Sequence, residues 1–247
     1  APLPSRMGHW VANFFGDYSF VFSRKSRAIV EGNLRRVLGL SVDQNTLRRT
    51  TRECFRNLSR SYYDLIRVPR FSPQKLNGKV ELLGLEYLEE ARRSGRGAVV
   101  ATAHIGNLDL VPQVALARSI PLTILVEQFE PEKVWKLVMR LRRTQGLSFQ
   151  AADARGIKVA FQALKRGEVV GLACDRAVLG RTIRTEFMGE AALMPVGAVE
   201  LALRAGAALL PLFCIRVGRD RYRMSIEPPI PLTRNGRGPQ GVREVVS

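Results

Sequence analysis

A histidine followed five positions later by an aspartate is the clearest chemical signal in this chain. His104 and Asp109 follow the apolar run 97–103, and His104 is one of two histidines among 247 residues. If a strand ends at His104 and a helix starts near Asn107, the turn between them brings the carboxylate back to the ring. A carboxylate at one ring nitrogen fixes the imidazole tautomer, so the other nitrogen can act as a general base toward a hydroxyl or thiol. A purely structural histidine at a strand end is the alternative.

Two further apolar runs also end in charged residues. Glu127 closes the run 121–127, and Asp175-Arg176 follows the run 168–174. The carboxyl ends of parallel strands meet at one edge of a sheet, where ligands bind. A base, carboxylates and a cation near a helix N-terminus suit a substrate that carries phosphate. The residues expected to gather at this edge are His104, Asp109, Glu127, Asp175 and Arg176.

Short apolar runs alternate with amphipathic segments of helical length from residue 97 onward. Continuous runs of Val, Leu, Ile and Ala indicate strands that are covered on both faces. The last two runs are joined by the turn 218–220, which suggests a hairpin. We therefore predict an α/β fold with a mixed, mostly parallel central sheet flanked by helices. Strands are expected at 97–103, 121–127, 168–174, 208–217 and 221–226, and helices at 108–118, 132–144, 156–165 and 197–204.

The N-terminal part of the chain is predicted to be an amphipathic helical region. Its clearest helix covers residues 46–67, with an apolar stripe formed by Leu47, Cys54, Leu58, Tyr62, Leu65 and Ile66. The other side of this helix is basic, which favours an anionic surface over an ordinary solvated face; it carries Arg48, Arg49, Arg52, Arg56 and Arg60. Residues 7–22 hold six aromatic side chains beside a basic segment, as in an interfacial membrane segment or in a helix packed on a core.

The composition indicates a globular protein with a polyanionic partner. Hydrophobic residues make up 46% of the chain, and 39 Lys and Arg against 22 Asp and Glu give a net charge of +17. Such an excess suits nucleic acid or an anionic membrane surface. The three cysteines, Cys54, Cys174 and Cys214, lack metal-ligand spacing and suggest reduced thiols. No apolar run reaches the roughly 18–20 residues that span a bilayer, and the start does not look like a signal peptide.

These motifs resemble the bacterial acyltransferases of the lipid A biosynthesis and lysophospholipid acyltransferase group. The similarity covers about residues 13–232, and its signature is the His-x4-Asp motif at His104 and Asp109. The form His-Ile-Gly-Asn-Leu-Asp is closest to the phosphatidylinositol mannoside acyltransferase branch. Glu127, Asp175-Arg176 and the block Phe187-Met-Gly189 followed by Met194-Pro195 match that branch as well. Two positions depart from it, since Leu108 replaces a tryptophan and Ala177 stands where another acid is common.

The resemblance implies a reaction and a set of roles. An acyl group would pass from acyl-CoA or acyl-carrier protein to a hydroxyl of a phospholipid or glycolipid, one similar to a phosphatidylinositol mannoside. His104 would be the general base and Asp109 would orient it, without a metal, a further cofactor or a covalent acyl-enzyme. The residues assigned to substrate binding are Asn107, Glu127, Asp175, Arg176 and Gly189. We expect Arg176 to pair with Glu127 or Asp175, which would either tie two strand ends together or shape the acceptor pocket.

The resemblance also implies a location and a domain organisation. The protein would be peripheral on the cytoplasmic face of the bacterial inner membrane. Residues 1–75 would form a membrane-proximal helical region, 76–232 the α/β acyltransferase domain and 233–247 a loop and a truncated C-terminal region. The alternatives are a lipid A-type late acyltransferase and, from another class, a basic α/β protein that binds nucleic acid without catalysis. Because no nucleic-acid motif is recognisable, we expect lipid rather than nucleic acid as the partner.

Overall fold

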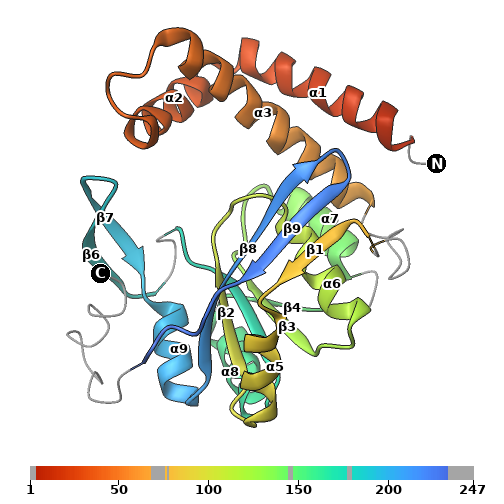
Figure 1. Ribbon diagram of the computed structural model, residues 1–247, viewed down its shortest axis with the longest axis vertical. Helices are drawn as coiled ribbons and strands as arrows, with labels where there is room; N and C mark the ends of the chain where they lie inside the picture. The colour runs from red at the N-terminus through yellow and green to blue at the C-terminus, as the bar shows by residue number, and fades with distance from the viewer. Residues whose placement is uncertain (1–3, 68–75, 77, 144–146, 177–179, 233–247) are drawn as a thin grey trace. The chain divides into compact units, whose positions relative to one another are not determined.

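The computed structural model describes residues 4–67, 76, 78–143, 147–176 and 180–232 (Figure 1). Two compact units make up the chain. One contains residues 1–67 and 186–190, and the other contains residues 68–185 and 191–247. The segment 233–247, predicted to be a loop, and Ala177 lie outside the described residues.

The first unit is built on three helices, α1 (Ser5–Phe22), α2 (Arg24–Leu38) and α3 (Gln44–Arg67). Small residues recur every four positions on α1, so that Gly8, Ala12 and Gly16 form one buried row that Phe20 extends. A Cβ on Gly16 would lie 2.6 Å from the Cα of Arg56, which is closer than real Cβ atoms approach a neighbour. The glycine therefore allows the backbones of α1 and α3 to come into direct contact.

Arginines of α3 hold α1 in place. Asp17 on α1 accepts hydrogen bonds from Arg52 and Arg56 at 2.6–2.8 Å, and Arg60 donates to Asn13 at 2.7 Å. The hydrogen bonds from the two guanidinium groups lower the pKa of Asp17 far below its usual range. The expectation that residues 48–60 present a free basic face is therefore wrong for these three arginines, because α1 supplies the polar partners that they bind.

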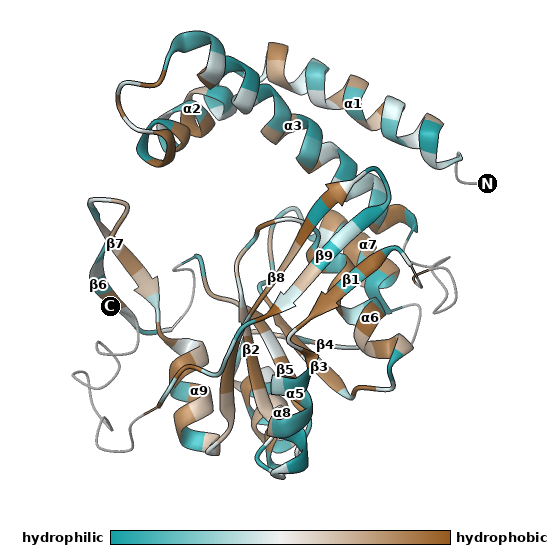
Figure 2. Cartoon of the chain, viewed as in Figure 1, coloured by the Kyte–Doolittle hydropathy of each residue, from teal (hydrophilic) through white to brown (hydrophobic). Residues whose placement is uncertain are grey.

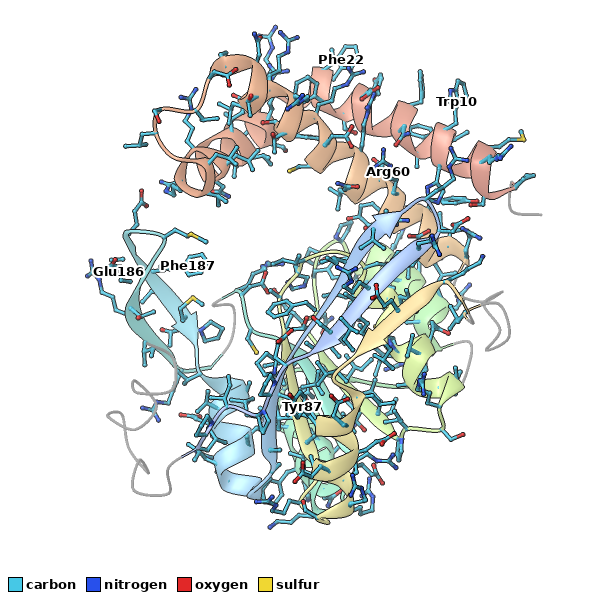
Figure 3. The ribbon with its side chains drawn as sticks, in the orientation of Figure 1. Trp10, Phe22, Arg60, Tyr87, Glu186 and Phe187 are labelled. Carbon is cyan, nitrogen blue, oxygen red and sulfur yellow. The ribbon has the colours of Figure 1, made fainter. Side chains whose placement is uncertain are left out.

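The side of α1 that faces away from α3 is apolar and exposed. Trp10 and Phe22 point away from α3 in Figure 3, whereas Arg60 lies between the two helices. Seven large apolar side chains of α1 are between 54% and 70% exposed: Met7, Trp10, Phe14, Phe15, Tyr18, Val21 and Phe22. In the described part of the chain, no helix is both long and apolar enough to cross a membrane.

The apolar stripe predicted on α3 is only partly correct. Leu47 and Leu65 are buried, whereas Leu58, Tyr62 and Ile66 are 55–57% exposed. The buried row is completed by Thr51 and Phe55 instead. Thr51 can be buried because its hydroxyl donates to the Leu47 carbonyl one turn back at 2.8 Å.

The second unit contains a seven-stranded sheet in the order β1-β9-β8-β2-β5-β3-β4. Strands β2, β3, β4, β5 and β8 are parallel, whereas β9 runs antiparallel to β8 and pairs in parallel with β1. The predicted mixed, mostly parallel sheet is thereby confirmed. The strands of this sheet are β1 (Val80–Leu83), β2 (Ala98–Thr102), β3 (Leu122–Val126), β4 (Ser148–Ala151), β5 (Val169–Ala173), β8 (Ala208–Gly218) and β9 (Arg221–Ile226).

Helices cover both faces of the sheet. On β2, Val100 packs in the core formed with α5 and α6, whereas its neighbour Val99 packs in the core formed with α8 and α9. Strand β2 is largely brown in Figure 2, as expected for a strand whose residues pack in both cores. The helices are α5 (Leu85–Arg93), α6 (Val111–Ala117), α7 (Glu132–Arg143), α8 (Ala154–Lys165) and α9 (Gly197–Ala205), with a short 3-10 helix η2 (Leu108–Leu110).

Several elements were not predicted. These are α2, β1, α5, β4 and a separate hairpin formed by β6 (Thr182–Phe187) and β7 (Glu190–Pro195). All the strands and helices predicted from residue 97 onward are present with ends shifted by up to three residues, with Thr144 outside the described residues.

Candidate active site

The register of the sheet brings the predicted site residues to one edge. Thr102 on β2 lies opposite Ala173 on β5. In the same register, His104 and Asp175, each two residues later in its own segment, lie opposite each other. β3 flanks β5 on its other side, and its last residue is followed directly by Glu127. Three neighbouring parallel strands therefore end in polar residues at the same edge of the sheet, as expected from their order in the sequence.

The loop after β2 is anchored to strand β8. Gly106 has a φ of +73°, and a Cβ at this position would overlap the carbonyl group of Cys214. The next residue, Asn107, donates its backbone N–H to the same carbonyl oxygen at 2.8 Å and is 3% exposed. Only glycine combines this backbone conformation with such a close approach. The Gly-Asn pair therefore fixes the turn that carries His104. The backbone of Asn107 contributes to this turn by its hydrogen bond to strand β8.

Asp175 holds His104 at two points. Its Oδ1 lies 2.8 Å from Nδ1 of the ring, and its Oδ2 accepts the backbone N–H of His104 at 3.1 Å. Among the described residues, Nε2 makes no hydrogen bond, and the side chain is 54% exposed. A carboxylate at Nδ1 favours the tautomer with the proton on that nitrogen, which leaves the Nε2 lone pair available as a base.

Asp109, which was expected to contact the ring, binds Arg142 of α7 instead. Its Oδ1 accepts from Nε of Arg142 at 2.6 Å, and both side chains are at most 22% exposed. The cause is the chain path, since η2 begins at Leu108 and carries the carboxylate toward α7. The predicted contact between His104 and Asp109 is therefore wrong, and Asp175 contacts the ring of His104 instead. Arg142 was missed because nothing in the sequence separates it from Arg140 and Arg143 beside it.

Glu127 and Arg176 form the ion pair that was expected at this edge. Nη2 of Arg176 lies 3.7 Å from Oε2 of Glu127, and the two side chains are 60% and 29% exposed. On the other side of β5, the backbone N–H of Cys174 donates to the Thr102 carbonyl at 2.7 Å and ties β5 to β2. Because Arg176 directly follows Asp175, the ion pair is connected through the backbone to the partner of His104.

Gly189 lies in the turn of the β6–β7 hairpin. Both turn residues have positive φ, +54° for Met188 and +77° for Gly189. Figure 3 labels Glu186 and Phe187 just before this turn, and Phe187 is 54% exposed. The backbone conformation is sufficient to explain the glycine. Segment 186–190 is grouped with the helical unit, so its placement beside His104 remains a prediction.

The cysteines differ in their surroundings. Cys54 is exposed, Cys174 is half-buried and Cys214 is buried. Burial raises the pKa of the Cys174 thiol to about 11 and that of Cys214 to about 12. Both thiols are therefore protonated at neutral pH and are poor nucleophiles. Within the described residues, no group of three His, Cys, Asp or Glu side chains could hold a metal ion.

A histidine ring that contacts a carboxylate at the edge of such a sheet is an arrangement that can activate a hydroxyl. Residues 1–240 match the sequence model of the family described as bacterial lipid A biosynthesis acyltransferase, and the chain belongs to this family.

Curated relatives in mycobacteria are similar over much of this chain. It is 30% identical over 194 residues to the phosphatidylinositol mannoside acyltransferase of Mycobacterium tuberculosis (strain ATCC 25618 / H37Rv), a match that covers 76% of this chain and 60% of the relative. It is 26% identical over 204 residues to the protein of the same name from Mycolicibacterium smegmatis, covering 80% of this chain and 66% of the relative. The chain thus spans about 60% of the length of the first relative.

Proposed function

We propose that this chain transfers a fatty acyl group from an acyl thioester to a hydroxyl group of a membrane glycolipid. The observation that carries the proposal is the contact between Asp175 and Nδ1 of His104 in a chain of this family. That contact prepares Nε2 to accept a proton, and Nε2 belongs to a half-exposed side chain that a substrate can reach.

The reaction proceeds by general-base catalysis. Nε2 of His104 takes the proton of the acceptor hydroxyl while its oxygen attacks the thioester carbonyl carbon. The tetrahedral intermediate collapses with cleavage of the carbon–sulfur bond, and the imidazolium returns its proton to the departing thiolate. Asp175 stabilises the imidazolium that exists between these two steps. Each bond formed is matched by one broken, and no covalent acyl-enzyme is required.

The other charged residues position this pair. The ion pair between Asp109 and Arg142 fixes η2 against α7, so it holds the far end of the loop whose near end carries His104. Glu127 and Arg176 line the neighbouring strand ends and would contact the acceptor headgroup. Arg176 is 60% exposed, so a phosphate group could compete with Glu127 for its guanidinium.

The acceptor that we propose is a lipid of the phosphatidylinositol mannoside type. The names of the mycobacterial relatives support it, as does the net charge of +17, which suits an anionic lipid. Acyl-CoA or acyl-carrier protein would be the donor. The exposed aromatic side of α1 would hold the protein on the cytoplasmic face of the bacterial inner membrane, with rings at the depth of the headgroups.

An acceptor panel tests the proposal. Isotope-labelled palmitoyl-CoA is supplied with phosphatidylinositol mannoside, a lipid A precursor or a lysophospholipid, and labelled products are identified by mass spectrometry. We expect the mannoside to be acylated, and His104→Ala to abolish the product without changing the melting temperature. Preference for the lipid A precursor would favour a late acyltransferase of the lipid A type. Failure of the folded protein to acylate any of these lipids, with acyl-CoA or with acyl-carrier protein as the donor, would reject the proposed activity.

A further inference from the structure

Helix α7 has an outer face that is both basic and apolar. Val134 is 44% exposed and Leu137 is 53% exposed, beside the exposed cations Lys133 and Arg140. The inner side of the helix is packed, since Val138 and Met139 are buried. We call the exposed residues Lys133, Val134, Lys136, Leu137 and Arg140 the α7 outer face.

The two kinds of side chain occupy adjacent sectors of the helix. Successive residues turn by about 100°, so the three cations at 133, 136 and 140 lie within about 60° of one another. Val134 and Leu137 fall in the neighbouring sector. Such an arrangement is typical of a helix that lies in the interface of a membrane, with cations toward phosphate and apolar groups toward the acyl chains.

The cations of this face have few partners of their own. Lys136 pairs with Glu132 at 2.7 Å one turn earlier. In the part of the chain that the structure describes, no carboxylate lies within 4 Å of Lys133 or Arg140. The face therefore keeps a net positive charge, which complements an anionic lipid surface.

Helix α7 lies at the same edge of the sheet as His104. It begins five residues after Glu127, at the end of β3, and its last turn holds Arg142, which binds Asp109. Asp109 in turn belongs to the loop that follows His104. A surface that contacts the α7 outer face would therefore be close to the proposed base.

We infer that the α7 outer face is a second membrane contact, which places the catalytic edge on the surface of an anionic bilayer. The inference rests on the proposed function, because the hydroxyl of a lipid acceptor stays at the interface and the base must reach it there. An acidic carrier protein could use the same charges. We favour lipid because Val134 and Leu137 expose branched apolar side chains beside the cations, and apolar burial strengthens interfacial binding.

Single-tryptophan variants test the contact. The chain contains two tryptophans, Trp10 on α1 and Trp135 on the inner side of α7, and both are changed to Phe. Leu137→Trp then places one reporter on the α7 outer face. Leu116→Trp is the matched control, since Leu116 is 37% exposed near the end of α6, which leads to the opposite edge of the sheet. A third protein, Trp135→Phe alone, retains Trp10 as the reporter for α1.

Fluorescence is measured with vesicles of brominated phosphatidylcholine and phosphatidylglycerol. We expect vesicles to quench Leu137→Trp strongly, by about half or more, and to leave Leu116→Trp nearly unchanged. Quenching of Trp10 without quenching of Leu137→Trp would overturn the inference, while membrane association through α1 would stand. If neither reporter were quenched and the protein did not sediment with the vesicles, the proposed membrane association would fail as well.

A charge substitution gives an independent readout. Leu137→Glu should weaken binding to phosphatidylglycerol vesicles by about tenfold or more, because it removes an apolar contact and adds a repelled charge. Leu116→Glu should not change it. Hydrolysis of a soluble short-chain thioester should be equal in both variants. If Leu137→Glu kept full vesicle binding but lost binding to an acidic acyl-carrier protein, the α7 outer face would be a site for that protein instead.

Discussion

Replacing Asp175 by Asn tests which of two carboxylates, that of Asp175 or that of Asp109, orients His104. The side chain of Asp175 accepts two hydrogen bonds from the same residue, one from the ring at 2.8 Å and one from the backbone N–H at 3.1 Å. An asparagine has one oxygen for these two donors. If that oxygen takes the backbone N–H, the amide NH2 group faces Nδ1 and moves the ring proton to Nε2. The ring then presents a donor where the reaction needs a base.

The size of the effect follows from this contact. A hydrogen bond to a charged group contributes about 1.5–3 kcal/mol, and a tenfold change in rate corresponds to about 1.4 kcal/mol. Its loss alone therefore costs roughly 10- to 150-fold. In serine proteases, where the corresponding aspartate is buried, the same change costs about 10⁴-fold. Because Asp175 is 33% exposed, we expect about a hundredfold decrease in kcat, with little change in the melting temperature.

Asp109→Asn is the matched control. It leaves the contact between Asp175 and His104 in place and weakens the ion pair to Arg142. We expect it to lower the melting temperature more than Asp175→Asn and to lower kcat less. Both variants are assayed with the same labelled thioester and lipid acceptor. If Asp175→Asn kept kcat within about threefold of wild type while a folded Asp109→Asn lost activity, Asp109 would be the orienting carboxylate and our reasoning would be refuted.

Three further predictions concern the turn, the ion pair and the helical unit. Gly106→Ala should lower the free energy of unfolding, measured by denaturant titration, by about 2 kcal/mol or more, because alanine is strained at positive φ and would overlap strand β8. An unchanged denaturation midpoint would contradict the close approach of Gly106 to the Cys214 carbonyl. Arg176→Ala and Glu127→Gln should each leave the melting temperature nearly normal, since an exposed ion pair contributes less than about 1 kcal/mol. Both should impair acyl transfer while slow thioester hydrolysis persists. A lowered melting temperature with full acyl transfer would indicate that the ion pair only holds the two strand ends together. The lowered pKa of Asp17 adds stability above about pH 4 that is lost as the pH falls. The melting temperature of wild type should therefore exceed that of Asp17→Asn at pH 7, and the two melting temperatures should approach each other in acid. A difference in melting temperature that did not change with pH would argue against a stabilising role of the Asp17 carboxylate.

The α/β part of the fold could be predicted from the sequence because its strands are buried on both faces. Runs such as 97–103 and 169–174 are mostly apolar, which indicates strands buried on both faces, and the helical segments between the runs indicate parallel pairing. Strand β4 was missed because Ser148–Ala151 is a short edge strand with polar residues. Strand β1 was missed for a similar reason, since half of its residues face solvent.

The site could be predicted as a set of residues but not as a set of contacts. Strand ends identified His104, Glu127 and Asp175, because parallel order brings such ends together. Which of Asp109 and Asp175 contacts His104 depends on the register of β2 and β5 and on the path of η2. Neither the register nor the path can be inferred from the residue pattern. Likewise, the arginines of α3 looked like a free basic face because their main partner, Asp17, is 35–39 positions away.

The most direct test of the account is the position of the ring proton on His104. The chain has two histidines, so ¹⁵N-labelled histidine gives two sets of ring signals, and His104→Ala assigns them. Spectra are recorded at about pH 9, where histidine is ordinarily neutral. Neutral imidazole in water favours the proton on Nε2, whereas the contact with Asp175 predicts it on Nδ1, with a return toward Nε2 in Asp175→Asn. A wild-type ring with its proton on Nε2 would contradict the proposed base.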